Sequence, residues 1–193
     1  MTTTKPNRIA VLLNDAFADW ETGFLTASAR DFFGAEVFHF SPDGKHVVSE
    51  GALRVVPSGS FNDPDPADFA ALVVCGSSKW AAPGAIDLSG LLREAEHAGT
   101  PIGTICAGTL TAARAGLLDV RRHTSNNGTW LKEQVPSYRG ESLYQDVNDA
   151  VADRGVVSAP GSAPASFARA MLGLVYPTHP ALAPACEMLA NAR

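Results

Sequence analysis

Short apolar runs alternate with amphipathic stretches along this chain. The runs are rich in aliphatic and β-branched residues and have the length of buried strands. They are RIAVLL (8–13), AEVFHF (35–40), AALVVC (70–75), PIGTI (101–105) and GVVSA (155–159). Strands of this kind, separated by helices, predict an α/β sandwich with a mostly parallel central sheet.

Helix signals lie between these runs. Asp19 stands where an N-cap belongs, and Ser162 and Pro164 stand where an N-cap and a first-turn proline belong. Gly116 lies near the expected end of another helix. Residues at helical spacing form the expected apolar faces: Leu88, Leu91, Leu92 and Ala95; Leu110, Ala113 and Leu117; Leu182, Ala185, Cys186 and Leu189.

Two further segments carry turn signals. Residues 41–60 contain SPDG and SEGALRVVPSG, which predict a turn and a hairpin-like excursion. RRHTSNNG (121–128) predicts a short strand that runs into a turn. No linker divides the chain, so residues 1–193 are expected to form one domain.

The composition excludes several classes of protein. The formal net charge is −5, with both signs interleaved, so no basic stripe for nucleic acid is present. The start, MTTTKPNRIAVLL, is too short for a membrane span and unlike a secretory signal. We expect a cytoplasmic protein without nucleic-acid or membrane partners. The three cysteines lack metal-type spacing, which argues against disulfides and zinc.

Cys106 is the first candidate for chemistry, because it ends one predicted strand and begins the next predicted helix. Parallel strands bring their carboxyl ends to one edge, where active sites usually lie. A helix N-terminus lowers the pKa of a thiol and favours a nucleophilic thiolate. A small buried core residue is the alternative interpretation. Cys186 is expected in the core. Cys75 ends a strand on the same sheet edge as Cys106 and is either a second thiol near the pocket or, as we favour, a filler at the end of that strand.

Glu21 is the second candidate. It opens a helix after the first strand, on the same sheet edge as Cys106. A carboxyl beside a thiolate is expected to keep its proton and to pass it to or from a substrate. Acidic residues are also favoured in any first helical turn, so a purely structural role is the alternative.

Further groups at this edge are candidates for supporting roles. The N–H groups of Ala107 and of Gly76 or Ser77 are placed to bind an oxyanion. His123 is a candidate base, although a structural histidine is the commoner case, and Asn126 either orients a group or holds a turn. The remaining histidines have no companion at ligand spacing, so neither a metal nor a cofactor is expected: His39, His46, His97 and His179.

Several motifs resemble one family. GTICAGTLTAARAGLLDVRRHTSN (103–126) resembles the nucleophile elbow and following segment of the ThiJ/PfpI superfamily, which has a class I glutamine amidotransferase-like fold. FADWE (17–21) is similar to its first-loop acid, and ALVVCGSSKW (71–80) takes the place of its P-G-G loop. GSAPASFARAMLGLV (161–175) is similar to its closing helix.

The resemblance implies a flavodoxin-like three-layer sandwich, a homodimer, Cys106 as the reactive thiol and Glu21 as its protonated partner. Family activities include hydrolysis or hydration of small electrophiles, glyoxalase or deglycase chemistry, peptidase activity and protection against oxidants. Ala107 and Asn126 stand where many members have histidine, which argues against glutamine hydrolysis for a synthase partner.

Two hypotheses follow. The first is a cysteine-dependent hydrolase or lyase acting on a small carbonyl or acyl compound, with Cys106 as nucleophile and Glu21 as proton carrier. The second is a non-catalytic sensor of oxidative stress that uses oxidation of Cys106.

Overall fold

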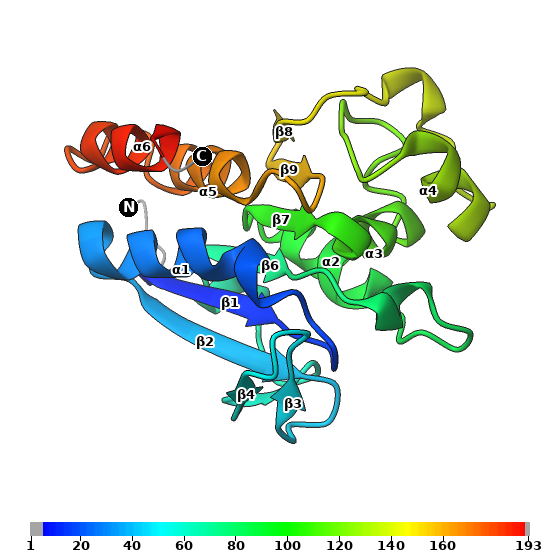
Figure 1. Ribbon diagram of the computed structural model, residues 1–193, viewed down its shortest axis with the longest axis horizontal. Coiled ribbons are helices and arrows are strands. Elements are labelled where there is room, and N and C mark those ends of the chain that lie inside the picture. Colours follow the sequence, from blue (N-terminus) through cyan, green and yellow to red (C-terminus); the bar gives the residue numbers. More distant parts are fainter. Residues whose placement is uncertain (1–5, 192–193) are drawn as a thin grey trace.

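The computed structural model describes residues 6–191. A parallel sheet in the order β5-β2-β1-β6-β7-β9-β8 runs through its centre, and only β8 is antiparallel to its neighbour (Figure 1). The strands of this sheet are β1 (Arg8–Leu12), β2 (Glu36–Ser41), β5 (Gly59–Ser60), β6 (Ala71–Val74), β7 (Ile102–Ile105), β8 (Val151–Asp153) and β9 (Val156–Ala159). The predicted α/β sandwich with a mostly parallel sheet is therefore confirmed.

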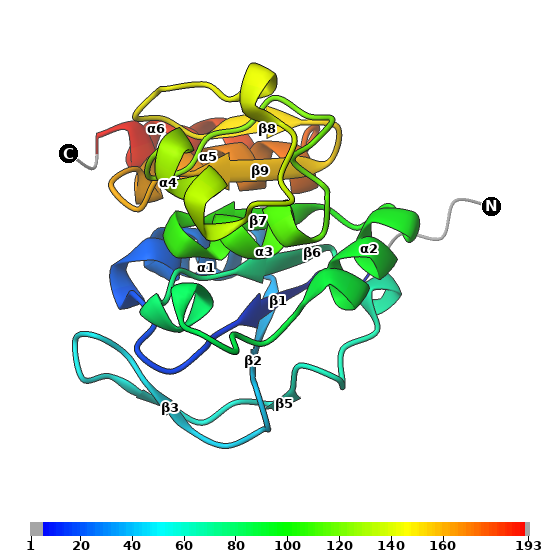
Figure 2. The same ribbon diagram turned by 90° about the vertical axis from the view of Figure 1, so that its right-hand side faces the viewer.

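Helices cover both faces of the sheet. α1 (Asp19–Phe33) packs against α5 (Pro164–Val175), which packs against α6 (Leu182–Ala190) on one face (Figure 1). α2 (Ser89–His97) and α3 (Thr109–Arg114) cover the other face, where α4 (Gly128–Gln134) packs against α3 (Figure 2). Short 3₁₀ helices occupy Pro66–Asp68, Ser78–Ala81, Cys106–Gly108 and Glu141–Leu143.

Alternation along the strands divides the apolar core between the two faces. In β1, Ile9 and Val11 belong to the core under α1 and α5, whereas Ala10 and Leu12 belong to the core under α2 and α3. Successive strand side chains point to opposite faces, so an unbroken apolar run is what a strand buried on both faces requires. For this reason the short apolar runs in the sequence predicted the positions of the strands correctly.

The excursion predicted between residues 41 and 60 is confirmed. β3 (Val47–Val48) and β4 (Arg54–Val55) form a small antiparallel pair outside the main sheet. The hairpin is attached near the start of α1, because Ser49 Oγ donates a hydrogen bond of 2.6 Å to Asp19 Oδ2. Asp19 is thus the first residue of α1 and not its N-cap, a position that Ala18 occupies.

Two other local predictions are wrong. Residues 121–128 form no strand beyond an isolated bridge between His123 and Tyr144, because side-chain acceptors take the N–H groups of Arg122 and Thr124. Asn127 there caps α4. Ser162 does not cap α5, since its hydroxyl donates to Asn148, although Pro164 does begin that helix.

Candidate active site

The carboxyl ends of β1, β6, β7 and β9 bring the candidate residues to one edge of the sheet. Cys106 follows β7 directly, Gly76 lies just after β6, and Gly161 lies just after β9. Glu21 is in the first turn of α1, which follows β1. Parallel strands place these connections side by side, as the sequence predicted.

The backbone at Cys106 is strained. Its φ is +56°, in the left-handed region that a residue with a Cβ rarely adopts. The neighbouring elbow is tight as well, because a Cβ on Gly108 would lie 2.6 Å from the Val74 carbonyl oxygen. A sharp strand-to-helix turn of this kind lifts a nucleophile out of the sheet and makes its side chain accessible.

Glu21 is fully buried beside the thiol. Its Oε2 accepts a hydrogen bond of 2.7 Å from the Gly76 N–H, and its Oε1 has no hydrogen-bond partner among residues 6–191. Oε1 and the Cys106 Sγ both lie 2.9 Å from the point that a Cβ on Gly161 would occupy. The free carboxyl oxygen and the sulfur therefore face the same small space, which only a glycine at position 161 leaves open.

Burial sets the protonation of this pair. Burial raises the pKa of Glu21 to about 7, against the opposing effects of contacts with Cys106, the Gly76 N–H and Cys75. Burial, and then the charge of an ionised Glu21, raise the pKa of the Cys106 thiol to about 11. Near neutral pH the two groups therefore share at most one negative charge.

The expectation of a lowered thiol pKa is thus wrong. A single 3₁₀ turn, Cys106–Gly108, separates the thiol from α3, which is itself only six residues long. So short a helix supplies little dipole, and desolvation of the thiolate exceeds it. The Asn126 amide and the Ala107 N–H act in the opposite direction and lower the pKa of the thiol.

Asn126 contacts the thiol directly. Its Nδ2 donates to Cys106 Sγ at 3.1 Å, and its Oδ1 accepts a hydrogen bond of 2.9 Å from the Gly161 N–H. The second bond fixes which end of the amide faces the sulfur. The carbonyl oxygen of Gly161 accepts a bond of 3.3 Å from the Trp20 indole. Gly161 and Trp20 were not predicted for the site, although the position of Gly161 after a predicted strand was a usable signal.

Three other candidates take different places. The Gly76 N–H is engaged by Glu21, so it is not free for an oxyanion in this arrangement. Ser77 Oγ donates to the Asp15 carbonyl oxygen at 2.6 Å and accepts from the Lys79 N–H, which makes it a cap for a 3₁₀ helix. Ser77 therefore has a structural role instead of an auxiliary one.

His123 is a structural histidine and not a free base. Its Nδ1 lies 2.7 Å from the Arg121 carbonyl oxygen, and its Nε2 lies 2.5 Å from the Tyr138 hydroxyl. Both ring nitrogens are thus engaged, and burial lowers the pKa of the imidazole. A neutral ring that donates from Nδ1 and accepts at Nε2 satisfies both contacts.

Cys75 is buried under the same carboxyl. Its Sγ donates to the Ala18 carbonyl oxygen at 3.3 Å and lies 3.8 Å from Glu21 Oε2. Burial raises the pKa of this thiol well above its usual value. Cys186 is half-buried on α6, so its expected place in the core is only partly realised. Within residues 6–191 no cluster of side chains has the composition of a metal site.

The comparison with known proteins now decides the family. The DJ-1/PfpI sequence profile matches residues 7–174. The chain belongs to the DJ-1/PfpI family. The crystal structure of the DJ-1 superfamily protein Atu0886 from Agrobacterium tumefaciens is 40% identical, with a TM-score of 0.88 over 96% of this chain and 99% of that one. The thiJ/pfpI family protein from Bacillus anthracis is 26% identical, with a TM-score of 0.79 over 90% of this chain and 85% of that one.

A curated relative adds a further similarity. The protein named uncharacterized protease YoaZ, from Bacillus subtilis (strain 168), is 28% identical over 158 residues, which are 78% of this chain and 75% of that protein. The predicted resemblance and the flavodoxin-like fold of this DJ-1/PfpI protein are therefore confirmed. In the part of the chain that the structure describes, no helix is both long and apolar enough to span a membrane.

Proposed function

We propose that this DJ-1/PfpI protein is a cysteine-dependent hydrolase or lyase that acts on a small carbonyl or acyl compound. The observation that carries the proposal is the buried Glu21 carboxyl, with one free oxygen facing the space occupied by the Cys106 sulfur. Its similarity to a protein named as a protease supports hydrolysis as the general class of reaction.

The raised pKa values of Glu21 and Cys106 support one path for the proton. Above about pH 7 Glu21 is ionised while the Cys106 thiol still holds its proton. Glu21 therefore takes the thiol proton as the sulfur bonds to the electrophilic carbon, and the carbonyl π electrons move to oxygen. The carboxyl then returns the proton to the leaving group or to the product oxygen. With an acyl compound, a water molecule next attacks the thioester carbon, and Glu21 takes a proton from that water and passes it to the sulfur as the sulfur–carbon bond breaks.

Two donors are placed to stabilise the developing charge. The Asn126 amide is held at 3.1 Å from the sulfur, and the Ala107 N–H interacts with the same atom. These donors serve first the thiolate and then the oxyanion that forms next to it. We assign the oxyanion site to the Ala107 N–H and the Asn126 amide. The Gly76 N–H could donate to the oxyanion only after its hydrogen bond to Glu21 is broken.

The proposal is tested by trapping the covalent intermediate. We expect rapid acid quenching after mixing with p-nitrophenyl acetate, or with a 2-oxoaldehyde, to leave a mass increase on the peptide that contains Cys106. The peptides of Cys75 and Cys186 serve as internal controls and are expected to stay unmodified. Equal modification of all three cysteines, or turnover without an adduct on Cys106, would contradict the proposal.

A second candidate function, a sensor of oxidants, is favoured by the different exposure of the cysteines. Cys106 is half-buried at the sheet edge, whereas Cys75 is fully buried, and burial raises the pKa of the Cys75 thiol well above its usual value. We expect equimolar hydrogen peroxide to oxidise Cys106 to sulfenic acid, with release of water, before Cys75. Dimedone labelling and peptide mass analysis measure the order. Oxidation of Cys75 first, or of both at the same rate, would exclude a selective sensor.

A further inference from the structure

Successive hydrogen bonds hold one chain segment between the buried Arg121, near the starts of β7 and β9, and the candidate active site beyond the other ends of these strands. This segment comprises residues 121–126, between α3 and α4. Arg121 lines a cavity of about 300 Å³ together with residues at the starts of β7 and β9. Asn126, at the other end of the segment, contacts Cys106 and Gly161 beyond the carboxyl ends of those strands.

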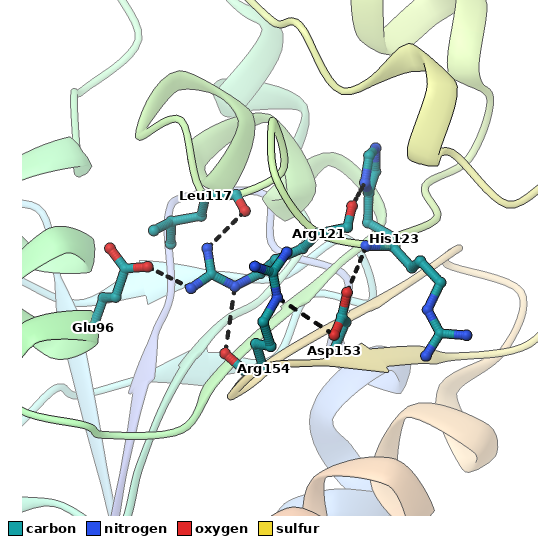
Figure 3. Close-up of polar contacts among 7 residues, drawn as sticks. Glu96, Leu117, Arg121, His123, Asp153 and Arg154 are labelled. Carbon is teal, nitrogen blue, oxygen red and sulfur yellow. Dashed lines mark hydrogen bonds and ion pairs between the residues drawn. The ribbon is translucent and has the colours of Figure 1, made fainter.

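The Arg121 side chain joins three separate elements, as Figure 3 shows. Its guanidinium donates to Glu96 on α2, to the Leu117 carbonyl oxygen after α3 at 2.9 Å, and to the Arg154 carbonyl oxygen between β8 and β9 at 3.3 Å. The side chain is only 9% exposed. A planar guanidinium with three acceptors in different elements fixes the start of the segment in position and in direction.

Each following residue is held by another element. The Arg122 N–H donates to Asp153 on β8 at 2.8 Å, and the Thr124 N–H donates to Ser158 Oγ on β9 at 2.9 Å. Ser125 Oγ is 2.7 Å from Thr109 Oγ1, which donates to the carbonyl oxygen of Cys106 itself. The hydrogen bonds thus continue along the segment as far as Asn126, which contacts the thiol.

Arg121 and His123 are coupled within this segment. The Arg121 carbonyl oxygen is the partner of His123 Nδ1, and His123 Nε2 is fixed by Tyr138. A shift of the Arg121 backbone therefore turns the imidazole as well as the chain. Because the Asn126 side chain is exposed at the other end, its orientation depends on the backbone that carries it and on the Gly161 N–H.

We propose that Arg121 is a positioning residue for the active site: by clamping α2, the end of α3 and the β8–β9 turn, it holds the segment 121–126 so that Asn126 Nδ2 stays on Cys106 Sγ. The inference rests on the proposed function only in one respect, namely that the position of Asn126 matters for catalysis. The contact that it explains is measured on the thiol alone, without any substrate.

The experiment measures alkylation of each cysteine by iodoacetamide at pH 8, by peptide mass analysis, in the full-length protein. Removing the donor in Asn126→Ala is expected to slow alkylation of Cys106 about tenfold, since a hydrogen bond to a charged group is worth about one pKa unit or more. Arg121→Met is expected to slow it about threefold or more, on the same reasoning. Arg122→Met, a change at an exposed neighbouring arginine, is the matched control and is expected to have no effect.

Two features separate positioning from simple loss of stability. Unfolding would expose the buried Cys75 and speed its alkylation, whereas lost positioning slows Cys106 and leaves Cys75 unchanged. The double variant Arg121→Met/Asn126→Ala is expected to react no more slowly than Asn126→Ala alone. Both changes act on the same contact, the hydrogen bond from Asn126 Nδ2 to Cys106 Sγ, which the second change cannot remove again. Arg121→Lys, which keeps the charge beside Glu96, is expected to restore part of the rate.

Unchanged alkylation of Cys106 in folded Arg121→Met, or effects that multiply in the double variant, would overturn the inference. If Arg121→Met does not fold, Glu96→Ala is the test. This change removes one of the three hydrogen-bond acceptors of Arg121, and it does so at a partly exposed side chain, where a substitution disturbs folding less. Slower alkylation of Cys106 is then expected, and a wild-type rate would overturn the inference. Failure of the proposed function would be distinguishable. The alkylation rates of Cys106 would change in the variants as expected, but no covalent intermediate on Cys106 would be trapped with a substrate.

Discussion

Cys106→Ala is expected to abolish turnover of any carbonyl or acyl substrate while the protein stays folded. The sulfur is the protein atom that bonds to the electrophilic carbon in the proposed reaction, and an alanine methyl group cannot replace it. We expect a loss of kcat/KM of about a thousandfold or more, because the nucleophile contributes at least this much to the rate of a covalent reaction. The melting temperature is expected to change by no more than a few degrees, since the residue is only half-buried.

Cys186→Ala is the matched control for this change. It removes another half-buried thiol, on α6, and is expected to leave turnover unchanged. Steady-state kinetics and thermal unfolding of the two variants side by side supply the measurement. Turnover retained by Cys106→Ala would exclude the nucleophile, and an unfolded variant would be replaced by Cys106→Ser.

Glu21→Gln is expected to make the protein more stable than wild type at pH 8, by up to about 3 kcal/mol in the free energy of unfolding. The carboxyl pKa is about 7 in the folded protein against 4.5 as its ordinary value. Between these values the folded state holds a proton that the unfolded state has released, so the stability of wild type falls as pH rises. Glutamine carries no such proton, and the advantage of the variant is expected to grow from pH 4.5 to pH 7.

Urea unfolding at pH 4.5, 6 and 8 measures this difference. Glu133→Gln, a change at an exposed glutamate, is the matched control and is expected to follow the pH dependence of wild type. The same Glu21→Gln protein is expected to lose turnover, because glutamine cannot accept the thiol proton. A stability difference that stays constant with pH would show that folding does not raise the pKa of Glu21.

The sequence was sufficient for the fold because apolar runs buried on both faces read clearly as strands. Ile9 to Leu12 in β1 contribute to the cores on both faces of the sheet, and so do Ala71 to Val74 in β6. The pairing of Glu21 with Cys106 also followed, since sheet topology alone brings the ends of β1 and β7 to one edge. These predictions depend on local pattern and chain order only.

The rest of the site depends on contacts that chain order does not determine. Asn126 lies in a polar segment whose pattern favours a turn, and only tertiary hydrogen bonds place its amide on the sulfur. His123 was a candidate base, beside the commoner structural role, because its Tyr138 partner cannot be identified from the sequence. The raised thiol pKa was missed because it depends on burial and on the length of α3, two quantities that a helix signal does not give.

The left-handed backbone conformation at Cys106 limits how far the stability of this protein can be increased. A residue with a Cβ at a φ of +56° costs on the order of 1 kcal/mol compared with glycine. Selection for stability alone would therefore replace the cysteine, so the residue can persist only while its sulfur is useful. Thermostability gained without loss of the thiol must then come from other parts of the fold, because at Cys106, as at Glu21, the change that would stabilise the protein removes a reactive group.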